Sequence, residues 1–322
     1  MADCWLAQCH LLIELLERSV VMPERDVDPS VHRRKLRNML RQTRENCGFT
    51  QSAAAEEMSW SVSKLIRIES GSVTISVNDL RALLRYYRIT DEDQVNSLLD
   101  VARLARKRSW LKAYRDIASD AYLAYLGAEA TAVRSYNFEP VLVPGLLQTD
   151  EYASEVLRVL RGPKIPSRTE GLVELRLTRQ ERILSRTDPP LDLHFLLDES
   201  VIRRPVGGSE VMSHQIKRLL DLSERDNISI RVIPYGLGLY RSIRVPFALL
   251  EFTDPEDETL LYLEYPQGGE VIREDVPALD NMTEDPSTTP PTYLEIFSEL
   301  EQSTAAEQTL GILQDTLQQF DA

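Results

Sequence analysis

The sequence predicts an α+β protein in which a compact bundle of five short helices precedes a domain with a mostly antiparallel sheet. From about residue 31 to residue 114, apolar residues recur at helical spacing between residues that start or stop helices. After residue 120, short runs typical of strands alternate with helical runs and turn residues. With 322 residues, the chain is long enough for two domains of ordinary size.

The predicted domain boundaries follow these changes of pattern. Residues 30–115 form the helical bundle, and residues 120–322 form the α+β domain. Residues 1–29 are an N-terminal extension whose amphipathic stretch has two interpretations, a docking helix or an upstream extension. No positively charged segment precedes the apolar patch of this extension, so it does not resemble a signal peptide.

Each helix of the bundle has its own start or stop signal. Gly48 ends the first helix, as glycine often does just past a helix end. Ser76 with Asp79, and Thr90 with Asp93, have the spacing of capping boxes. These signals place the five helices at about 31–47, 50–58, 61–71, 77–87 and 90–114.

The second domain mixes helical and strand patterns. Residues 138–145 contain two prolines among apolar residues and predict a rigid loop or an edge segment. Residues 275–291 are rich in Pro, Thr, Asp and Glu and predict a loop. We expect helices at about 149–162, 169–187, 209–225, 292–301 and 303–319, and strands at 191–197, 228–233, 245–252, 259–265 and 269–273.

Charge is distributed unevenly along the chain. The whole sequence has 37 basic and 51 acidic residues, a net charge of −14. Residues 31–115 hold 17 basic and 9 acidic residues, a local net charge of +8, so the remainder carries −22. A basic module suits a polyanion such as nucleic acid, and the acidic remainder would confine that contact to the basic face.

Composition also excludes several classes of protein. No run reaches the roughly 18–20 apolar residues that a membrane span needs. The three cysteines form no disulfide framework, which is typical of a reducing cytoplasm, so we expect a cytoplasmic protein. The four histidines are far apart in sequence, and no arrangement of nucleophile and base stands out. We therefore expect no metal, no cofactor and no enzyme activity.

The segment from Thr50 to Gly71 is the most informative part of the bundle. It has the pattern of two short helices joined by a tight turn at Ser59-Trp60. A helix N-terminus presents backbone N–H groups to phosphate, and small polar residues with one arginine suit entry into a major groove. The expected outer face of the second helix consists of Ser61, Val62, Ser63, Lys64 and Arg67.

This segment resembles the helix-turn-helix of the XRE group of bacterial repressors, whose bundle is lambda-repressor-like. The matching residues are Phe49-Thr50-Gln51, Ala55, Met58, Ser61, Ser63, Leu65, Arg67-Ile68-Glu69 and Gly71. One departure is Ser59, because the family usually has glycine in the turn. A residue other than glycine in a left-handed conformation costs on the order of 1 kcal/mol, so we expect slight strain there.

The resemblance implies a role for each matched position of the motif. Gln51 would hold a phosphate at the start of the first helix of the pair. Ser61 and Lys64 would lie at the rim, next to the DNA backbone. Val62 and Ser63 would face base edges together with Arg67.

Arg67 is the strongest candidate for a base contact, because its fork can pair with O6 and N7 of guanine together. The alternative is that Arg67 pairs with Glu69 or another neighbour on a solvated face; Glu69 itself is expected to be structural. Six cations of the first helix would add sequence-independent attraction to phosphates: Arg33, Arg34, Lys35, Arg37, Arg41 and Arg44.

The second half resembles the C-terminal domain of actinobacterial antitoxin-like XRE regulators, on residues 137–149 and 197–208. Each segment also has a purely structural alternative to partner or ligand binding. The first is a loop that braces the two domains, and the second is a local charge network that positions a loop. Our candidates for a partner or ligand region are Pro140, Pro144, Gly145, Gln148, Asp198, Glu199, Arg203 and Arg204.

The resemblance implies a sequence-specific transcription regulator that binds double-stranded operator DNA, as a homodimer reading half-sites about one helical turn apart. Its C-terminal domain would receive a signal from a ligand or from a small partner protein encoded beside it. One alternative is an antitoxin-like protein that neutralises this small partner and binds DNA for autoregulation. Another is an enzyme in the C-terminal half, which would need a deep polar pocket around Asp198, Glu199 and Arg203.

Overall fold

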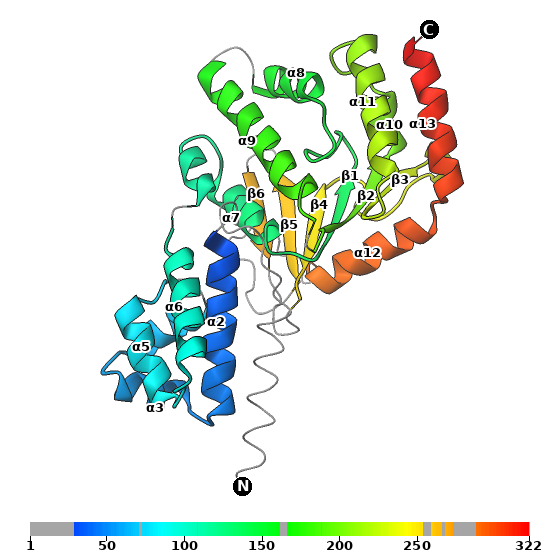
Figure 1. Cartoon of the computed structure of the whole chain (residues 1–322). Coiled ribbons are helices and arrows are strands. Elements are labelled where there is room, and N and C mark those ends of the chain that lie inside the picture. Colours follow the sequence, from blue (N-terminus) through cyan, green and yellow to red (C-terminus); the bar gives the residue numbers. More distant parts are fainter. Residues whose placement is uncertain are drawn as a thin grey trace. The chain divides into compact units, whose positions relative to one another are not determined.

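The computed structural model describes residues 29–70, 73–107, 109–161, 166–187, 189–253, 259–265, 268–272 and 288–321. The chain divides into two compact units, Met1–Arg106 and Lys107–Ala322 (Figure 1). The boundary lies a few residues before the expected one near residue 115. The predicted N-terminal extension lies outside the described residues, apart from Pro29.

The first unit is the predicted helical bundle. Thr50, Ser61 and Ser76 each cap a helix, since each side chain accepts a hydrogen bond from the backbone N–H three residues later. The described helices are α2 (Pro29–Asn46), α3 (Gln51–Glu57), α4 (Val62–Glu69), α5 (Val77–Tyr86) and α6 (Glu92–Ala105).

The fifth helix differs from the prediction at both ends. Its cap is Asp91, whose carboxylate accepts the backbone N–H of Gln94 at 2.7 Å, so the predicted capping box at Thr90 is wrong. The helix ends at Ala105, and Trp110–Tyr114 forms a short 3₁₀ helix, η1, in the second unit. Leu111 and Tyr114 are buried in the core of that unit. They were assigned to the fifth helix because their apolar spacing continues the pattern of α6.

The core of the first unit lies where α2, α4, α5 and α6 meet. Leu40, Leu65, Leu80 and Leu99 are fully buried there. Ala55, on α3, is also buried, as expected for a small residue where two helices approach closely. This core fixes α4 by its inner side and leaves its other side at the surface.

The second unit is built on one six-stranded sheet of order β3-β2-β1-β4-β5-β6 (Figure 1). Strands β1, β2 and β3 are parallel, and the remaining ladders are antiparallel. The overall class is therefore α+β, as predicted, and three of the five ladders are antiparallel. The strands are β1 (Arg134–Glu139), β2 (Asp192–Asp198), β3 (Ile228–Ile233), β4 (Phe247–Glu251), β5 (Leu260–Tyr265) and β6 (Gly268–Ile272).

Strand β1 lies in the middle of the sheet, where the prediction placed a loop or an edge for residues 138–145. On one face of this strand Ser135 and Asn137 are polar but buried, and Asn137 donates a hydrogen bond to Ser135 at 3.0 Å. Tyr136 and Phe138, on the other face, alternate with these polar residues, but this alternation covers only residues 135–138 and leads directly into Pro140, which favours a loop or an edge. Residues from Pro140 onward form the irregular connection that was expected.

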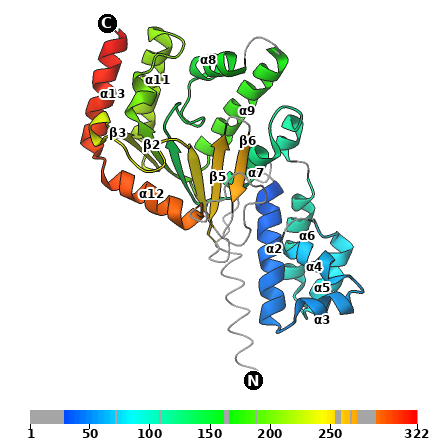
Figure 2. The ribbon, with the colours of Figure 1, turned by 180° about the vertical axis from the view of Figure 1, so that it is seen from behind.

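Helices cover both faces of this sheet (Figures 1 and 2). Phe195, Leu197 and Ile230 belong to one core, with α7, α9, α11 and α13. Phe138 and Phe247 belong to the other core, with Phe297 of α12. The helices of this unit are α7 (Asp120–Glu129), α8 (Asp150–Arg161), α9 (Pro166–Leu184), α10 (Glu199–Arg203), α11 (Ser209–Ser223), α12 (Pro290–Gln302) and α13 (Ala306–Asp321).

Candidate nucleic-acid interface

Helix α4 presents one side to the core and the other side to the surface. Leu65 and Ile68 are buried, whereas Val62 and Ile66 are 40% and 45% exposed. Three polar residues share the exposed side: Ser63, Arg67 and Ser70. Ser61 caps the helix by accepting the backbone N–H of Lys64 at 3.2 Å. The predicted outer face is therefore exposed at Ser61, Val62, Ser63 and Arg67, whereas Lys64 is half-buried. Ile66 is an exposed residue of this face that the prediction did not include.

Arg67 lies on this exposed side without a carboxylate partner among the described residues. Its Nε donates a hydrogen bond to the backbone oxygen of Ser63 at 3.2 Å, which directs the side chain along the helix. Glu69, the partner considered in the alternative, is buried and bound elsewhere. Arg67 is exposed at the surface of α4.

Lys64 has a different environment from Arg67. Its Nζ lies 3.9 Å from the centre of the Trp60 ring and 3.3 Å from Oδ2 of Asp79, on α5. These contacts connect the start of α4 to the turn before it and to the next helix. Within the described part of the unit, Lys64 therefore braces the motif as well as contributing charge at its rim.

The turn between α3 and α4 passes through Ser59 in a left-handed conformation, with φ of 54°. The backbone N–H of Trp60 donates to Ala55 at 2.8 Å and closes the turn. The usual glycine at this position predicts a left-handed residue, and Ser59 adopts that conformation despite its side chain.

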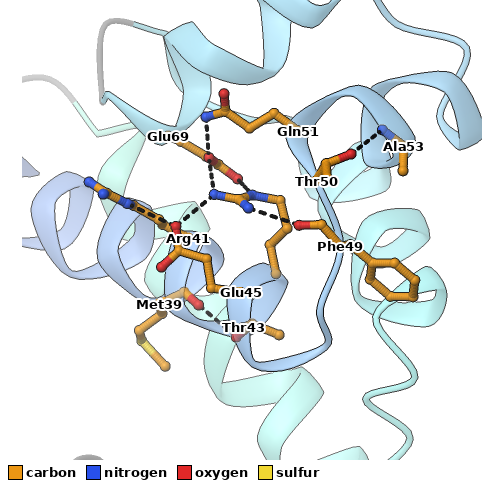
Figure 3. Close-up of polar contacts among 10 residues, drawn as sticks. Met39, Arg41, Thr43, Glu45, Phe49, Thr50, Gln51, Ala53 and Glu69 are labelled. Atoms are coloured by element: carbon orange, nitrogen blue, oxygen red, sulfur yellow. Dashed lines mark hydrogen bonds and ion pairs between the residues drawn. The ribbon is translucent and has the colours of Figure 1, made fainter.

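A buried network holds the two helices of the motif on α2 (Figure 3). Arg44 donates to Glu69 through Nε at 2.7 Å and through Nη2 at 3.1 Å. The same guanidinium donates to the backbone oxygen of Phe49 at 2.9 Å and to Glu45 at 2.9 Å. Gln51 donates from Nε2 to Oε2 of Glu69 at 2.8 Å. The expectation for Glu69 as a structural residue agrees with this placement.

Arg44 corrects one of the expected phosphate contacts. The residue is buried, and its donors are engaged by Glu69, Glu45 and Phe49, so it is not a surface cation. Burial works against its charge, but the hydrogen bonds and charge of Glu69 hold the pKa of Arg44 above its ordinary value. Helical spacing could not separate Arg44 from the arginines around it, because its buried partner lies 25 residues away.

The other arginines of α2 occupy varied positions. Arg33 donates from Nε to the backbone oxygen of Ala105 at 2.9 Å. Arg37 donates to Asn38 at 3.1 Å and, from Nη1, to the backbone oxygen of Ser70 at 3.4 Å, at the end of α4. Arg41 is exposed and pairs with Glu45 at 3.2 Å. Arg34 and Lys35 are half-buried, and burial lowers the pKa of Lys35.

In the second unit, the fold brings the two predicted partner segments to one edge of the sheet. The connection after β1 begins at Pro140, and α10 follows directly after β2. Ser200, in the first turn of α10, donates from Oγ to the backbone oxygen of Pro140 at 3.3 Å. The carboxyl ends of neighbouring parallel strands form the edge where ligands commonly bind in α/β sheets.

The acidic pair at this edge is occupied by hydrogen bonds. Asp198 caps α10 by accepting the N–H of Ser200 at 2.8 Å, and it accepts the hydroxyl of Tyr240 at 2.6 Å. Glu199 is buried, accepts from Arg203 and accepts the backbone N–H of Tyr235 at 2.7 Å. These bonds form a local charge network of the kind expected in the structural alternative for this segment. Arg204 is exposed.

These carboxylates also anchor a surface loop at both of its ends. Between Tyr235 and Tyr240 the chain is exposed, and it presents the apolar side chains of Tyr235, Leu237 and Leu239. Gly238 allows the loop to turn, with φ of 75°.

The connection after β1 is braced by α9 and α11. Gln148 is buried and donates to the backbone oxygen of Val143 at 2.6 Å, while Arg176 of α9 donates to its Oε1. Gln180 of α9 donates to the backbone oxygens of Gly145 and Gln148 at 2.7 and 2.9 Å. A Cβ on Gly145 would lie 3.2 Å from Nη1 of Arg179, so glycine permits this close approach. Pro140 and Pro144 are buried.

Sequence reasoning missed a buried ionic cluster on α7 and α9. Arg179 donates to Glu129 from Nε and from Nη2, both at 2.7 Å, and Tyr125 donates to Glu129 at 3.0 Å. Burial, followed by the charge of Glu129, raises the pKa of Tyr125 well above its usual range. The burial of Arg179 could have been predicted, because Arg179 continues the buried stripe of Leu172 and Leu175 at helical spacing.

Two family models match this chain. Residues 35–98 match a helix-turn-helix domain, and residues 122–285 match a domain of unknown function, DUF5753. The helix-turn-helix match spans α3 and α4 with the helices that support them. No curated protein and no solved structure matches the chain. Among the helices that the structure describes, none has the length and apolar content of a membrane span.

Proposed function

This chain belongs to the DUF5753 family and carries a helix-turn-helix domain in front of that domain, and from this premise we propose that it is a sequence-specific transcription regulator of the XRE type that binds operator DNA in the cytoplasm. The observation that carries the proposal is the exposed side of α4, with Arg67 at the surface of a helix whose inner side is fixed by the core. The net charge of +8 on residues 31–115 supports it.

In this proposal, α4 enters the major groove. Arg67 pairs with a guanine, and Val62 and Ser63 face neighbouring base edges. Ser61, at the N-terminus of α4, and Gln51, at the N-terminus of α3, contact phosphates on either side of the groove. Glu69 orients Gln51 by accepting its amide at 2.8 Å. Lys64, Arg33, Arg34, Arg37 and Arg41 contribute attraction to the backbone, whereas Arg44 acts inside the fold.

The second unit receives the signal in this proposal, from a ligand or from a small protein encoded nearby. Its support is the edge of the sheet where the Pro140 connection meets α10, next to the exposed loop that carries Tyr235, Leu237 and Leu239. The antitoxin-like alternative would use the same edge to neutralise the small protein. We propose a homodimer, because helix-turn-helix dimers bind two half-sites one helical turn apart.

The test of DNA binding is the substitution Arg67→Ala in the full chain. We expect specific binding to weaken by about 1–3 kcal/mol, with one base position relaxed, because the bidentate contact to guanine is lost. The operator is first obtained by selection from random double-stranded DNA, and affinity is then measured by titration at several salt concentrations. An unchanged affinity for the selected operator would contradict the assignment of Arg67.

Three control variants separate base reading from attraction to phosphates. Arg67→Lys keeps the charge but not the planar fork, so it should lose discrimination and retain non-specific binding. Gln51→Ala should weaken binding to all sequences alike, because a phosphate contact carries no sequence information. Arg103→Ala removes the same charge from an exposed position on α6, where Arg103 pairs with Asp100, and should leave base preference unchanged.

The partner hypotheses are separated by a binding titration of the full chain. The small proteins encoded next to it in the genome are purified and mixed with it at micromolar concentration. A complex that the substitution Leu239→Asp abolishes would support the edge in the second unit as the docking site. The absence of any complex would count against both partner hypotheses and leave a ligand as the signal.

A further inference from the structure

Two apolar side chains occupy the exposed side of α4, in a position that the phosphate and guanine contacts do not explain. Val62 and Ile66 are 40% and 45% exposed and follow each other at a spacing of four residues. At about 100° of rotation per residue, Ile66 lies about 40° around the helix from Val62 and about 60° from Ser63. The two side chains therefore form a strip beside the polar row of Ser63 and Arg67.

This strip is not part of the core of its own unit. The apolar residues that hold α4 in place are Leu65 and Ile68, which are buried in the core, whereas Val62 and Ile66 do not belong to it. A strip of two side chains is small compared with the roughly 800 Å² per partner of a stable protein interface. Its neighbours are Ser63, Arg67 and Ser70, which are residues suited to polar base edges and phosphates.

Building on the proposed function, we infer that Val62 and Ile66 determine sequence specificity by packing against the 5-methyl groups of thymine in the operator. The thymine methyl is the one apolar group that a base edge presents in the major groove. Neither side chain can donate or accept a hydrogen bond, so apolar contact is the discrimination that each can provide. The operator half-site then places thymine beside the guanine that pairs with Arg67.

The order of side chains around α4 makes this inference more specific. Ile66 lies between Val62 and the Ser63–Arg67 row, so its thymine lies nearest to the guanine contacted by Arg67. Val62, in the first turn after the Ser61 cap, contacts a thymine farther from that guanine and closer to the phosphates. Two separate methyl contacts are therefore expected in each half-site.

The experiment removes single methyl groups from the selected operator. Each thymine in turn is replaced by deoxyuridine, which keeps every hydrogen bond of the pair and lacks only the methyl. For the full-length protein we expect a loss of affinity of about threefold to tenfold at two positions in each half-site. Ile66→Ala should bind the thymine and deoxyuridine forms equally at the position nearest to the guanine, and Val62→Ala should do so at the other.

A matched control comes from the second unit. Leu310 on α13 is 46% exposed, so Leu310→Ala removes a comparable exposed aliphatic side chain and should leave the sensitivity to deoxyuridine unchanged. Thermal unfolding of each variant establishes that the first unit is folded at the temperature of the titration. Because alanine favours helix and both residues are at the surface, we expect folded variants.

The outcomes distinguish this inference from the function on which it depends. If the protein selects an operator but tolerates deoxyuridine at every position, the thymine contacts are wrong and the regulator proposal stands. If the sensitivity persists in both alanine variants, Val62 and Ile66 are not the residues responsible. If no sequence is selected from random DNA, the proposed function itself is overturned.

Discussion

In the part of the chain that the structure describes, each unit contains a buried bidentate arginine–glutamate pair, and the two pairs have nearly the same geometry. Arg44 and Glu69 in the first unit have side chains that are 8% and 4% exposed, and Arg179 and Glu129 in the second have side chains that are 8% and 1% exposed. Both are bidentate, with Nε at 2.7 Å from a carboxylate oxygen. The same chemical group therefore connects helices that are far apart in sequence in both units.

The two pairs differ in what their carboxylates hold besides arginine. Glu69 also accepts Gln51, so the first pair connects the core to the proposed DNA-binding surface (Figure 3). Glu129 also accepts Tyr125, and Arg179 donates to the hydroxyls of Tyr125 and Tyr122 at 3.2 and 3.4 Å. The second pair thus ends in a buried aromatic cluster, where Tyr125 stacks on Tyr262 with ring centres 4.6 Å apart. One pair orients a surface, and the other stabilises an interior.

The largest expected effect is that of Glu129→Ala. Removal of one member of a buried ion pair leaves the other charge without compensation, which typically costs about 3–5 kcal/mol. We expect a loss of this size in the free energy of unfolding of the second unit. Hydrogen exchange of the full chain, followed by mass spectrometry, assigns the change to peptides of β1, α7 and α9, while peptides of the first unit keep their protection.

A double variant checks the cause of that loss. Glu129→Leu combined with Arg179→Met replaces both charges by apolar side chains of similar size, so no uncompensated charge remains. We expect the double variant to be more stable than Glu129→Ala. If it were equally destabilised, shape and the tyrosine contacts, rather than the unpaired charge, would explain the effect.

Glu69→Ala is expected to have the next largest effect, and it acts on two properties at once. The unpaired Arg44 should destabilise the first unit by about 2–4 kcal/mol, because the charge stays buried without its main partner. Gln51 loses its acceptor, so affinity for all DNA sequences should fall even at temperatures where the unit is folded. The measurements are hydrogen exchange for stability and a salt-controlled DNA titration.

The comparison with Glu129→Ala gives this experiment its control. That variant should keep its DNA affinity, since the bonds of Glu129 to Arg179 and Tyr125 lie within the second unit. Equal loss of DNA binding in both variants would contradict the separate roles of the two pairs.

The two pairs also show where the sequence was informative. The helices of the bundle, five of the six strands and the exposed side of α4 follow from periodicity and capping residues, which act over a few positions of the chain. The ion pairs join residues 25 and 50 positions apart, so no local pattern contains both partners. Arg44 was therefore predicted as a surface cation like the other arginines of α2, and the burial of Arg179 on α9 was not predicted.

Strand β1 was not predicted, for a related reason. Its buried residues Ser135 and Asn137 satisfy each other by a hydrogen bond, so their burial depends on a contact that composition does not reveal. The positive φ at Ser59 was predictable, because the motif that surrounds it has a fixed turn geometry. Features set by a local motif could be predicted, whereas those set by contacts between distant segments could not.

The smallest expected effect is that of replacing a left-handed serine by glycine, which can be tested at one site in each unit. Ser59 has φ of 54° in the turn before α4, and Ser242 has φ of 60° in the connection between β3 and β4. Replacement by glycine relieves the steric strain of about 1 kcal/mol but increases the entropy of the unfolded chain, so we expect a net stabilisation of about 0.5 kcal/mol at each site. Ser59→Gly should raise protection only in the first unit, and Ser242→Gly only in the second. If either substitution stabilised both units equally, the two units would unfold as one cooperative body, and the separate effects expected for Glu69→Ala and Glu129→Ala would also merge.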